Sequence, residues 1–295
     1  MNFIYREKGA GITSRLVVYC LLLAFPIFLW AQPDLSDLRN EIATGSAEEK
    51  RNALFEIRNL RSEGASRIAI PALSDSLEMI RATAVSSVVF LPRNEAVELL
   101  VPLLADKAPF VRRETASALG ELGDASAAPA LIRALQKESE IENRSAAAMA
   151  LGRLDDVSAI EPLLAILKKK SSEPDEFLRS SAARSVGEII QTVRFGKHQP
   201  LAPQNFLPDK YKEKLTANAS VGPEASQILA KALPILTKVL GNSREAAETR
   251  RGAAFAVGAL GTAEAREILR SHLTDSDPYL AEICKEALLD FPPNN

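Results

Sequence analysis

The sequence predicts an all-α fold, a right-handed solenoid of about seven helix pairs, and two observations point to it. A basic residue returns along the chain at steps of 31 to 35 residues, with one longer step of 71. An alanine-rich segment of helical periodicity follows each return. A fixed period of this length is typical of repeat proteins, in which each unit packs only on its neighbours. The recurring basic positions, here named the anchors, are Lys50, Arg81, Arg112, Arg144, Arg179 and Arg250, and Ala281 stands in the anchor position of the last repeat.

The segment that follows each anchor predicts one helix of the pair. Positions three, four and seven after the anchor are small or apolar, as in Ala147, Ala148 and Leu151, and this spacing marks one helical face. Glycine stands eight residues after four anchors, although it costs up to about 1 kcal/mol of helix propensity. We expect it to allow a close approach of the neighbouring helix. A second glycine three residues later, Gly123 or Gly261, fits a helix stop. The glycines at position eight are Gly120, Gly152, Gly187 and Gly258.

The segment before each anchor predicts the other helix, which carries an early proline in most repeats. A proline is tolerated in the first turn of a helix, because its missing amide has no helical partner there. Pro234 is the exception, since its helix is predicted to begin near Glu224, and we expect a kink or two short helices at that point. The early prolines are Pro71, Pro102, Pro129 and Pro162.

An acidic residue stands six residues before most anchors, at the predicted turn between the two helices of a pair. There it can cap the second helix and pair with an anchor from a stacked repeat. We therefore interpret the anchors as a structural ladder and not as a phosphate site. Surface pairs of this kind contribute roughly 0–1 kcal/mol each. The turn acids are Asp75, Asp106, Glu138, Glu173 and Asp275.

The stretch from Asp106 to Gly123 contains Asp, then Val-Arg, then Ala-Ser-Ala-Leu-Gly, then Leu-Gly. This pattern resembles the HEAT-like repeats first described around phycobilin lyases. The resemblance covers about residues 36–191 and 224–291. It implies the fold and leaves the function open, because such repeats occur in scaffolds, lyases, hydroxylases and DNA-repair proteins.

Motifs that mark common enzyme sites are absent from the sequence, which has no HExxH, GxSxG, GxxxxGK or CxxC. Deoxyhypusine hydroxylase has this repeat type and binds iron through His-Glu pairs. Here His198 precedes Gln199 and His272 precedes Leu273, so the resemblance brings no iron ligands with it. We therefore expect no metal, no cofactor and no catalytic residues, and hence a protein that is not an enzyme.

Residues 1–31 are predicted to be a secretory signal. A basic start precedes an apolar run, Leu16–Trp30, and Ala31 offers a small residue before the expected cut. The alternative is a membrane anchor formed by residues 16–31, although the run is shorter than the roughly 20 residues of a spanning helix. Cleavage would take the net charge from −2 to −4 and leave Cys284 as the one cysteine. The prediction is an exported protein, periplasmic or secreted, that does not contact a membrane after cleavage.

The repeats are predicted to fill residues 32–291, ahead of a short tail, 292–295. One step between anchors, from Arg179 to Arg250, contains a surplus that we assign to an insertion at 191–223. This segment has four prolines and an excess of basic over acidic residues. Loops longer than about 12–15 residues are usually functional or disordered. We expect the insertion to interrupt the stack, and the alternatives are a clamp on a ligand and a disordered loop.

Positions one, five and nine after an anchor are predicted to point outward from the second helix, which lines the concave side in related solenoids. They bring methionine and phenylalanine next to arginines, a composition found in interaction hot spots. The candidate partner-binding residues are Arg113, Met149, Arg153, Arg184, Arg251 and Phe255.

From this surface we predict a non-catalytic scaffold that binds a protein or peptide, acidic and partly apolar. The net charge of −2 gives no global field that would attract nucleic acid. Two alternatives stay open, a chromophore-handling enzyme similar to the bilin lyases and a repeat protein that binds nucleic acid.

Overall fold

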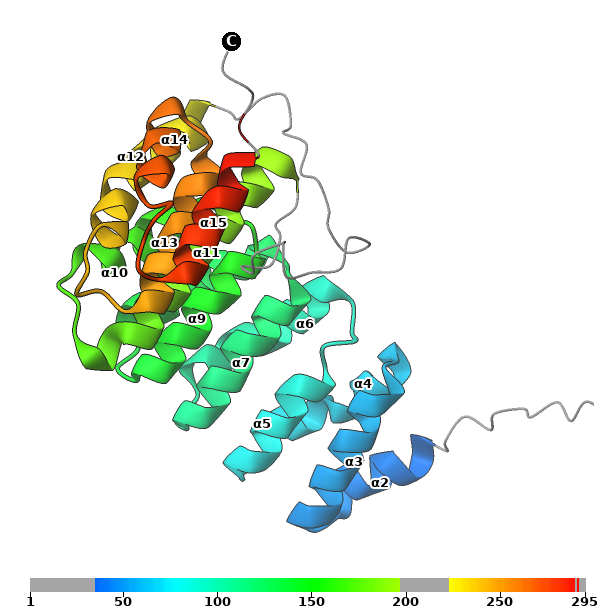
Figure 1. Ribbon diagram of the computed structural model, residues 1–295. Coiled ribbons are helices and arrows are strands. Elements are labelled where there is room, and N and C mark those ends of the chain that lie inside the picture. The colour runs from blue at the N-terminus through cyan, green and yellow to red at the C-terminus, as the bar shows by residue number, and fades with distance from the viewer. Residues whose placement is uncertain (1–34, 197–222, 290, 292–295) are drawn as a thin grey trace, which may run out of the picture.

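A computed structural model of the chain describes residues 35–196, 223–289 and 291, and every regular element within these ranges is a helix (Figure 1). The helices form seven consecutive pairs, each an A helix followed by a B helix. This confirms the predicted all-α solenoid. The predicted signal segment, most of the predicted insertion and the tail at 292–295 lie outside the described residues.

The B helices contain the anchors and follow one another in a single row (Figure 1). They are α3 (Ala47–Leu60), α5 (Glu78–Ser87), α7 (Pro109–Leu122), α9 (Ile141–Arg153), α11 (Glu176–Phe195), α13 (Ala247–Leu260) and α15 (Pro278–Leu289).

The A helices pack behind the B row, and several of them combine an α-helix with a 3₁₀ turn. They are α2 (Leu35–Thr44), α4 with η1 (Glu63–Ala69, Ile70–Ser74), α6 with η2 (Arg93–Leu100, Val101–Ala105), η3 with α8 (Ala125–Ala127, Ala128–Lys137), η4 with α10 (Val157–Ala159, Ile160–Lys168), α12 (Pro223–Leu240) and α14 (Ala263–Ser271). A further 3₁₀ turn, η5 (Glu173–Asp175), leads into α11.

The prolines of the A helices act differently from one repeat to the next. Pro71 and Pro102 do not open an α-helix but stand at the start of η1 and η2, after α4 and α6 have ended. A proline inside a helix lacks an amide and clashes with the carbonyl four residues back, which favours the switch to a 3₁₀ turn. Pro129 lies in the first turn of α8, as predicted. Of the two alternatives expected at Pro234, a kink or two short helices, the second is wrong, because α12 runs through this proline as one helix.

The small residues at position eight bring neighbouring B helices into contact. A Cβ atom added to Gly120 in α7 would lie 2.8 Å from Cα of Ala150 in α9, too close for any side chain. The B helices touch at every step of their row, whereas contacts along the A row are sparser. The closer contacts along the B row agree with the expectation, taken from related solenoids, that the B helices line the concave side.

The long step between Arg179 and Arg250 does not interrupt the stack. Helix α11 packs directly on α13, and α10 packs on α12, so the two repeats on either side of the step are adjacent layers. The predicted insertion also starts too early, because α11 continues to Phe195 and buries Gln191. The expectation that the insertion interrupts the stack is wrong. It assumed that repeats far apart in the sequence are also far apart in space.

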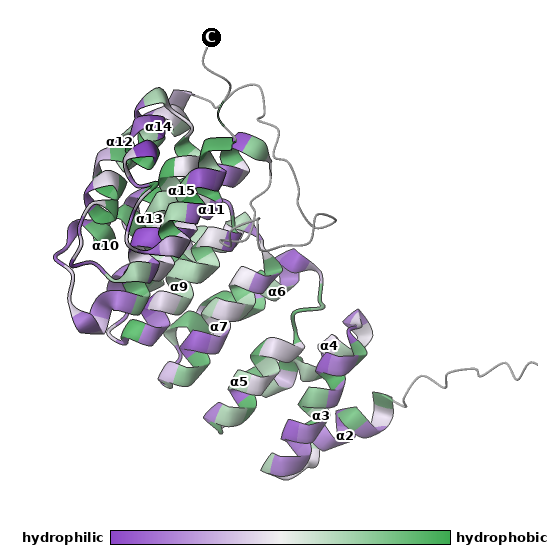
Figure 2. Ribbon diagram, in the orientation of Figure 1, coloured by the Kyte–Doolittle hydropathy of each residue, from purple (hydrophilic) through white to green (hydrophobic). Residues whose placement is uncertain are grey.

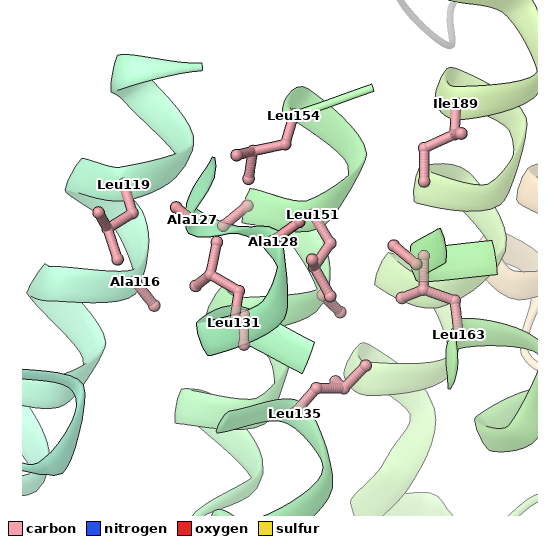
Figure 3. Close-up of a cluster of buried hydrophobic side chains, with 14 of the residues drawn as sticks. Ala116, Leu119, Ala127, Ala128, Leu131, Leu135, Leu151, Leu154, Leu163 and Ile189 are labelled. Atoms are coloured by element: carbon pink, nitrogen blue, oxygen red, sulfur yellow. The ribbon is translucent and has the colours of Figure 1, made fainter. Parts of the chain in front are cut away.

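Leucine, isoleucine and alanine side chains fill the space between the rows. Figure 3 shows Leu131 of α8 and Leu151 of α9 within one cluster of buried side chains, and both are fully buried. Figure 2 shows hydrophobic and hydrophilic residues on different sides of the same helices, as expected for helices with one buried face. Gly123 and Gly261 end α7 and α13 in the left-handed conformation, each with a φ of 62°, which confirms them as helix stops.

Within the described ranges, no helix is long and apolar enough to cross a membrane.

Candidate functional site

The exposed surface of the B helices is the candidate site, and three of the predicted residues lie open on its central part. Met149 and Arg153 lie one turn apart on α9, and Arg184 lies on the neighbouring helix α11. Met149 is 38% exposed, and the side chain of Arg184 is 52% exposed. A large apolar side chain is thus exposed on the same two neighbouring helices as two exposed arginines.

Phe255 does not belong to this surface, and its prediction as a partner-binding residue is wrong. Its exposed fraction is 8%, because the ring folds back onto α11. A Cβ atom added to Gly187 would overlap this ring, so the ring occupies the space that glycine leaves free. The periodicity within one helix cannot reveal this burial. It depends on another repeat, where Gly187 has no side chain and so leaves room for the ring.

Arg251 and Arg184 already have carboxylate partners within the fold. Arg251 binds Asp277 at 2.7 Å and Glu248 at 2.5 Å, and its guanidinium lies 4.8 Å from the centre of the Tyr279 ring. Arg184 donates to Glu188 at 2.8 Å. Such pairing neutralises part of the positive charge that we expected these positions to offer.

The guanidinium groups of Arg113 and Arg153 are less neutralised by carboxylates of the fold than those of Arg184 and Arg251. Arg113 is 3.7 Å from Glu114 and lies 5.1 Å from the centre of the Phe110 ring, with 43% of its side chain exposed. Arg153 is exposed and forms no ion pair with any carboxylate in the described part of the chain. Of the predicted arginines, Arg153 is therefore the one most available to an external anion.

A second set of exposed residues escaped the sequence analysis. Large apolar side chains stand two residues before several anchors, in the first turn of a B helix, one turn ahead of position one. Met79 is 50% exposed, Phe177 60% and Tyr279 51%, and Phe110 occupies the same place in α7. The recurrence of a large apolar residue at this position was the available signal. These residues extend the apolar part of the concave surface to the edge where the B helices begin.

The anchors form a ladder of ion pairs between successive repeats. Each paired anchor binds the turn acid of the next repeat, which confirms the predicted ladder at four of the six anchors. The pairs with predicted acids are Lys50–Asp75 at 2.8 Å, Arg81–Asp106 at 2.7 Å, Arg112–Glu138 at 2.6 Å and Arg250–Asp275 at 2.5 Å.

These pairs are more buried than expected. The side chains of Arg81 and Asp106 are 7% and 8% exposed, so the description as surface pairs is wrong. Asp106 also accepts the backbone amide of Ala108, and Arg81 donates to the backbone oxygen of Asp75. The Arg81–Asp106 rung therefore joins two successive turns. The predicted helix capping is not seen at Asp75 or Asp106, whose carboxylates accept the amides of Leu77 and Ala108, the residues just before α5 and α7.

Two anchors depart from the predicted pairing. Arg144 donates to the carbonyl oxygen of Leu135, and its predicted partner Glu173 is exposed. Arg179 binds Glu245 at 2.7 Å across the long step, with side chains that are 3% and 1% exposed. Glu245 escaped the sequence analysis because it stands five residues before its anchor and not six.

The ladder lowers the pKa of its carboxyl groups. A hydrogen bond from Arg112, opposed by burial, lowers the pKa of Glu138 from 4.5 to about 2. Hydrogen bonds from Arg81 and Arg250 lower the pKa of Asp106 and of Asp275 in the same way. The charged form is the one that the fold stabilises, as in a structural ion pair.

The described residues offer no group of three or more His, Cys, Asp or Glu side chains arranged to hold a metal. His272 lies within hydrogen-bond distance of the carbonyl oxygen of Ile268, at 2.9 Å. Cys284 is fully buried, and burial raises the pKa of its thiol to about 12. His198 lies outside the described residues.

Comparison with known families identifies the repeats. Residues 103–187 match the family described as HEAT repeats, and residues 249–275 match the PBS lyase HEAT-like repeat. The chain therefore contains HEAT-like repeats, as its sequence pattern indicated.

Solved structures support the same fold. The chain matches an engineered protein with a TM-score of 0.55 and 18% identity, over 87% of this chain and 67% of that one. It matches Kap121p, in a crystal structure with bound Pho4p, with a TM-score of 0.55 and 15% identity, over 92% of this chain and 28% of that one. At these identities the likeness establishes the solenoid fold.

A curated relative corrects one expectation. Deoxyhypusine hydroxylase-B of Oryza sativa subsp. japonica is 25% identical over 266 residues, which are 81% of this chain and 86% of the relative. That relative is an enzyme by name. The expectation that the chain is not an enzyme, which depended on missing motifs, is therefore overturned.

Proposed function

Because the chain folds as a HEAT-like solenoid, we propose that it binds a protein or peptide along the concave surface of its B helices. The observation that supports this is the open patch at the centre of the row, where Met149, Arg153 and Arg184 stand exposed side by side on α9 and α11. A solenoid presents equivalent positions of successive repeats as one extended surface, which suits a long partner segment.

The partner is an acidic and partly apolar segment. Arg153 offers a positive charge without an internal partner in the described part of the chain, and Arg113 is partly open. Exposed apolar side chains stand on the same row of helices, Met149 on α9 and Phe177 in the first turn of α11. Rings and long apolar side chains close to guanidinium groups dominate the binding energy of many interfaces.

Charge reversal tests this proposal. A partner isolated with the full chain from its native source is titrated against the wild type and the Arg153→Glu/Arg184→Glu variant. We expect the affinity to fall more than tenfold, which corresponds to about 1.4 kcal/mol. The circular dichroism spectrum should not change, because both side chains are exposed.

The matched control reverses two charges on the opposite side. Arg133→Glu/Arg270→Glu makes the same change in net charge on the A helices α8 and α14. If this control weakens binding as strongly as the B-helix variant, the effect is one of net charge and the site lies elsewhere.

The hydroxylase relative raises the question of a metal, and the donor set does not fit one. The His-Glu pairs that the resemblance associates with iron have no counterpart, since the whole sequence has two histidines, neither followed by glutamate. Among the described residues, His272 lies outside any cluster of metal ligands. We therefore derive no metal-dependent step, and the binding surface is the property that carries the proposal.

A further inference from the structure

Four lysines line a groove between two adjacent repeats. It lies between the end of α10 and helix α12, in two adjacent repeats, and encloses about 480 Å³. Its lining includes Lys168, Lys169 and Lys170, at the end of α10, and Lys238 of α12. Apolar side chains and two polar ones complete the lining: Leu167, Pro234, Ile235 and Val239, with Ser171 and Asn242.

The floor of the groove adds no net charge. Arg179 and Glu245 lie there as a buried ion pair, 2.7 Å apart. None of the four lysines forms an ion pair with a described carboxylate, and all four are exposed. Four unpaired ammonium groups around one groove are unusual in a chain whose net charge is −2.

Lysines at the end of a helix are ordinarily explained by the negative pole of the helix dipole. At the end of α10 that role is already filled. The guanidinium of Arg179 donates to the carbonyl oxygens of Ile166 and Lys169, each at 2.9 Å, and to that of Leu167 at 3.4 Å. The carbonyl groups that would attract the lysines are thus occupied by a buried arginine.

We propose that this groove is a binding site for a phosphate or diphosphate group. An ammonium group is a compact point charge that binds phosphate well, and four of them match a group with several negative charges better than a single carboxylate. The site is also held in place, because Arg179 fixes the backbone at Lys169 and Lys238 stands on a packed helix.

The same fold offers a comparison groove two repeats away. The corresponding groove between the repeats of α6 and α8 encloses about 530 Å³. Its unpaired cations are Arg133 and Lys137, and the carboxylates of Asp106 and Glu138 belong to its lining. With fewer free positive charges, this groove should bind phosphate groups much more weakly.

Calorimetric titration of the full chain with inorganic pyrophosphate tests the site. We expect one saturable site at low salt, weakened more than tenfold in Lys169→Gln/Lys170→Gln/Lys238→Gln. The control Lys107→Gln/Arg133→Gln/Lys137→Gln removes three exposed positive charges near the comparison groove and should bind as the wild type does. Because all these side chains are exposed, the thermal midpoint should be the same in both variants.

Equal weakening in both variants, or no saturation with the wild type, would overturn the proposal. A second arm uses vesicles that contain phosphatidic acid, measured by co-sedimentation. Loss of vesicle binding in the first variant assigns the site to phosphate on a lipid surface. Pyrophosphate binding without vesicle binding assigns it to a soluble phosphate compound. Neither arm depends on the concave surface, so the outcome is independent of the proposed function.

Discussion

Single residues in this chain are constrained mainly by the space between neighbouring B helices. The glycines at position eight illustrate this, since each stands where a neighbouring repeat leaves no room. A Cβ atom at Gly152 would meet the side chains of Ser185 and Glu188, and one at Gly258 would meet Ala287. Glycine is thus required at these positions by the neighbour and not by its own helix.

Gly120→Ala should destabilise the protein by about 1–3 kcal/mol, because the added methyl group would overlap the Ala150 backbone and overpack the core. The matched control is Gly64→Ala in α4, where the nearest atom is 3.9 Å away and the helix should gain about 0.5–1 kcal/mol. Chemical denaturation measures both. Equal effects of the two substitutions would mean that the α7–α9 contact is not as close as described.

The lowered pKa of Glu138 predicts how the stability of the folded chain depends on pH in the acid range. Its pKa is lowered from 4.5 to about 2 in the folded chain, so its contribution is complete above pH 4.5 and is lost as the pH falls toward 2. In Glu138→Gln this part of the pH dependence should disappear, and the variant should be less stable than the wild type at neutral pH. Thermal unfolding between pH 2 and pH 7 measures the difference.

The control for this experiment is Glu142→Gln, one helix turn away at an exposed position. Its stability should follow the wild type through the acid range. A Glu138→Gln variant that keeps the full acid dependence would contradict the ion pair with Arg112.

At the scale of the element, the ladder of ion pairs joins the separate helix pairs into one stack. Each paired anchor starts in one B helix and ends in the turn of the next repeat, so a rung cannot form within a single pair. The rung between Arg179 and Glu245 is the most buried of them and joins the layers across the long step.

Removal of Glu245 should therefore be severe. Glu245→Ala leaves the guanidinium of Arg179 buried without its counter-charge, which typically costs about 3–5 kcal/mol. Glu161→Ala is the control, since it breaks the exposed pair between Glu161 and Lys231 that joins the same two layers. We expect no measurable change in the midpoint of chemical denaturation for this control. Comparable losses would show that exposure does not decide the strength of these pairs.

The sequence was sufficient for the elements that repeat and insufficient for those that depend on a single neighbour. Helix pairs, the glycine stops Gly123 and Gly261 and most of the ladder follow from periodicity, because their signals recur in more than one repeat. Phe255 and Glu245 were misread or missed for the opposite reason. Phe255 is buried because Gly187, in another repeat, leaves room for its ring. Glu245, the partner of Arg179, is 66 residues away in the sequence.

At the scale of the whole molecule, the candidate surface was predictable in place and only partly in composition. Position one, five and nine did identify Met149 and Arg153 as exposed. They could not reveal that Arg251 is held by Asp277, because an ion pair depends on the loop of the next repeat. The exposed apolar residues that include Met79 and Phe177 could be predicted only by noticing that each stands two residues before an anchor position.

Export remains a prediction of the sequence, and its segment lies outside the described residues. We expect cleavage after Ala31, which leaves Gln32 at the new N-terminus. Mass spectrometry of the natively produced protein measures the terminal residue. Recovery of an uncut chain in the membrane fraction would favour the anchor at 16–31 instead.

The direct packing of α11 on α13 has a consequence for the connectivity of the chain. The two layers hold each other through helix contacts and the buried rung, and neither involves residues 197–222, through which the chain connects them. The covalent link at this point sets the effective concentration of one part for the other. A chain cut within residues 197–222 would then behave as a complex of two polypeptides, whose stability rises with protein concentration.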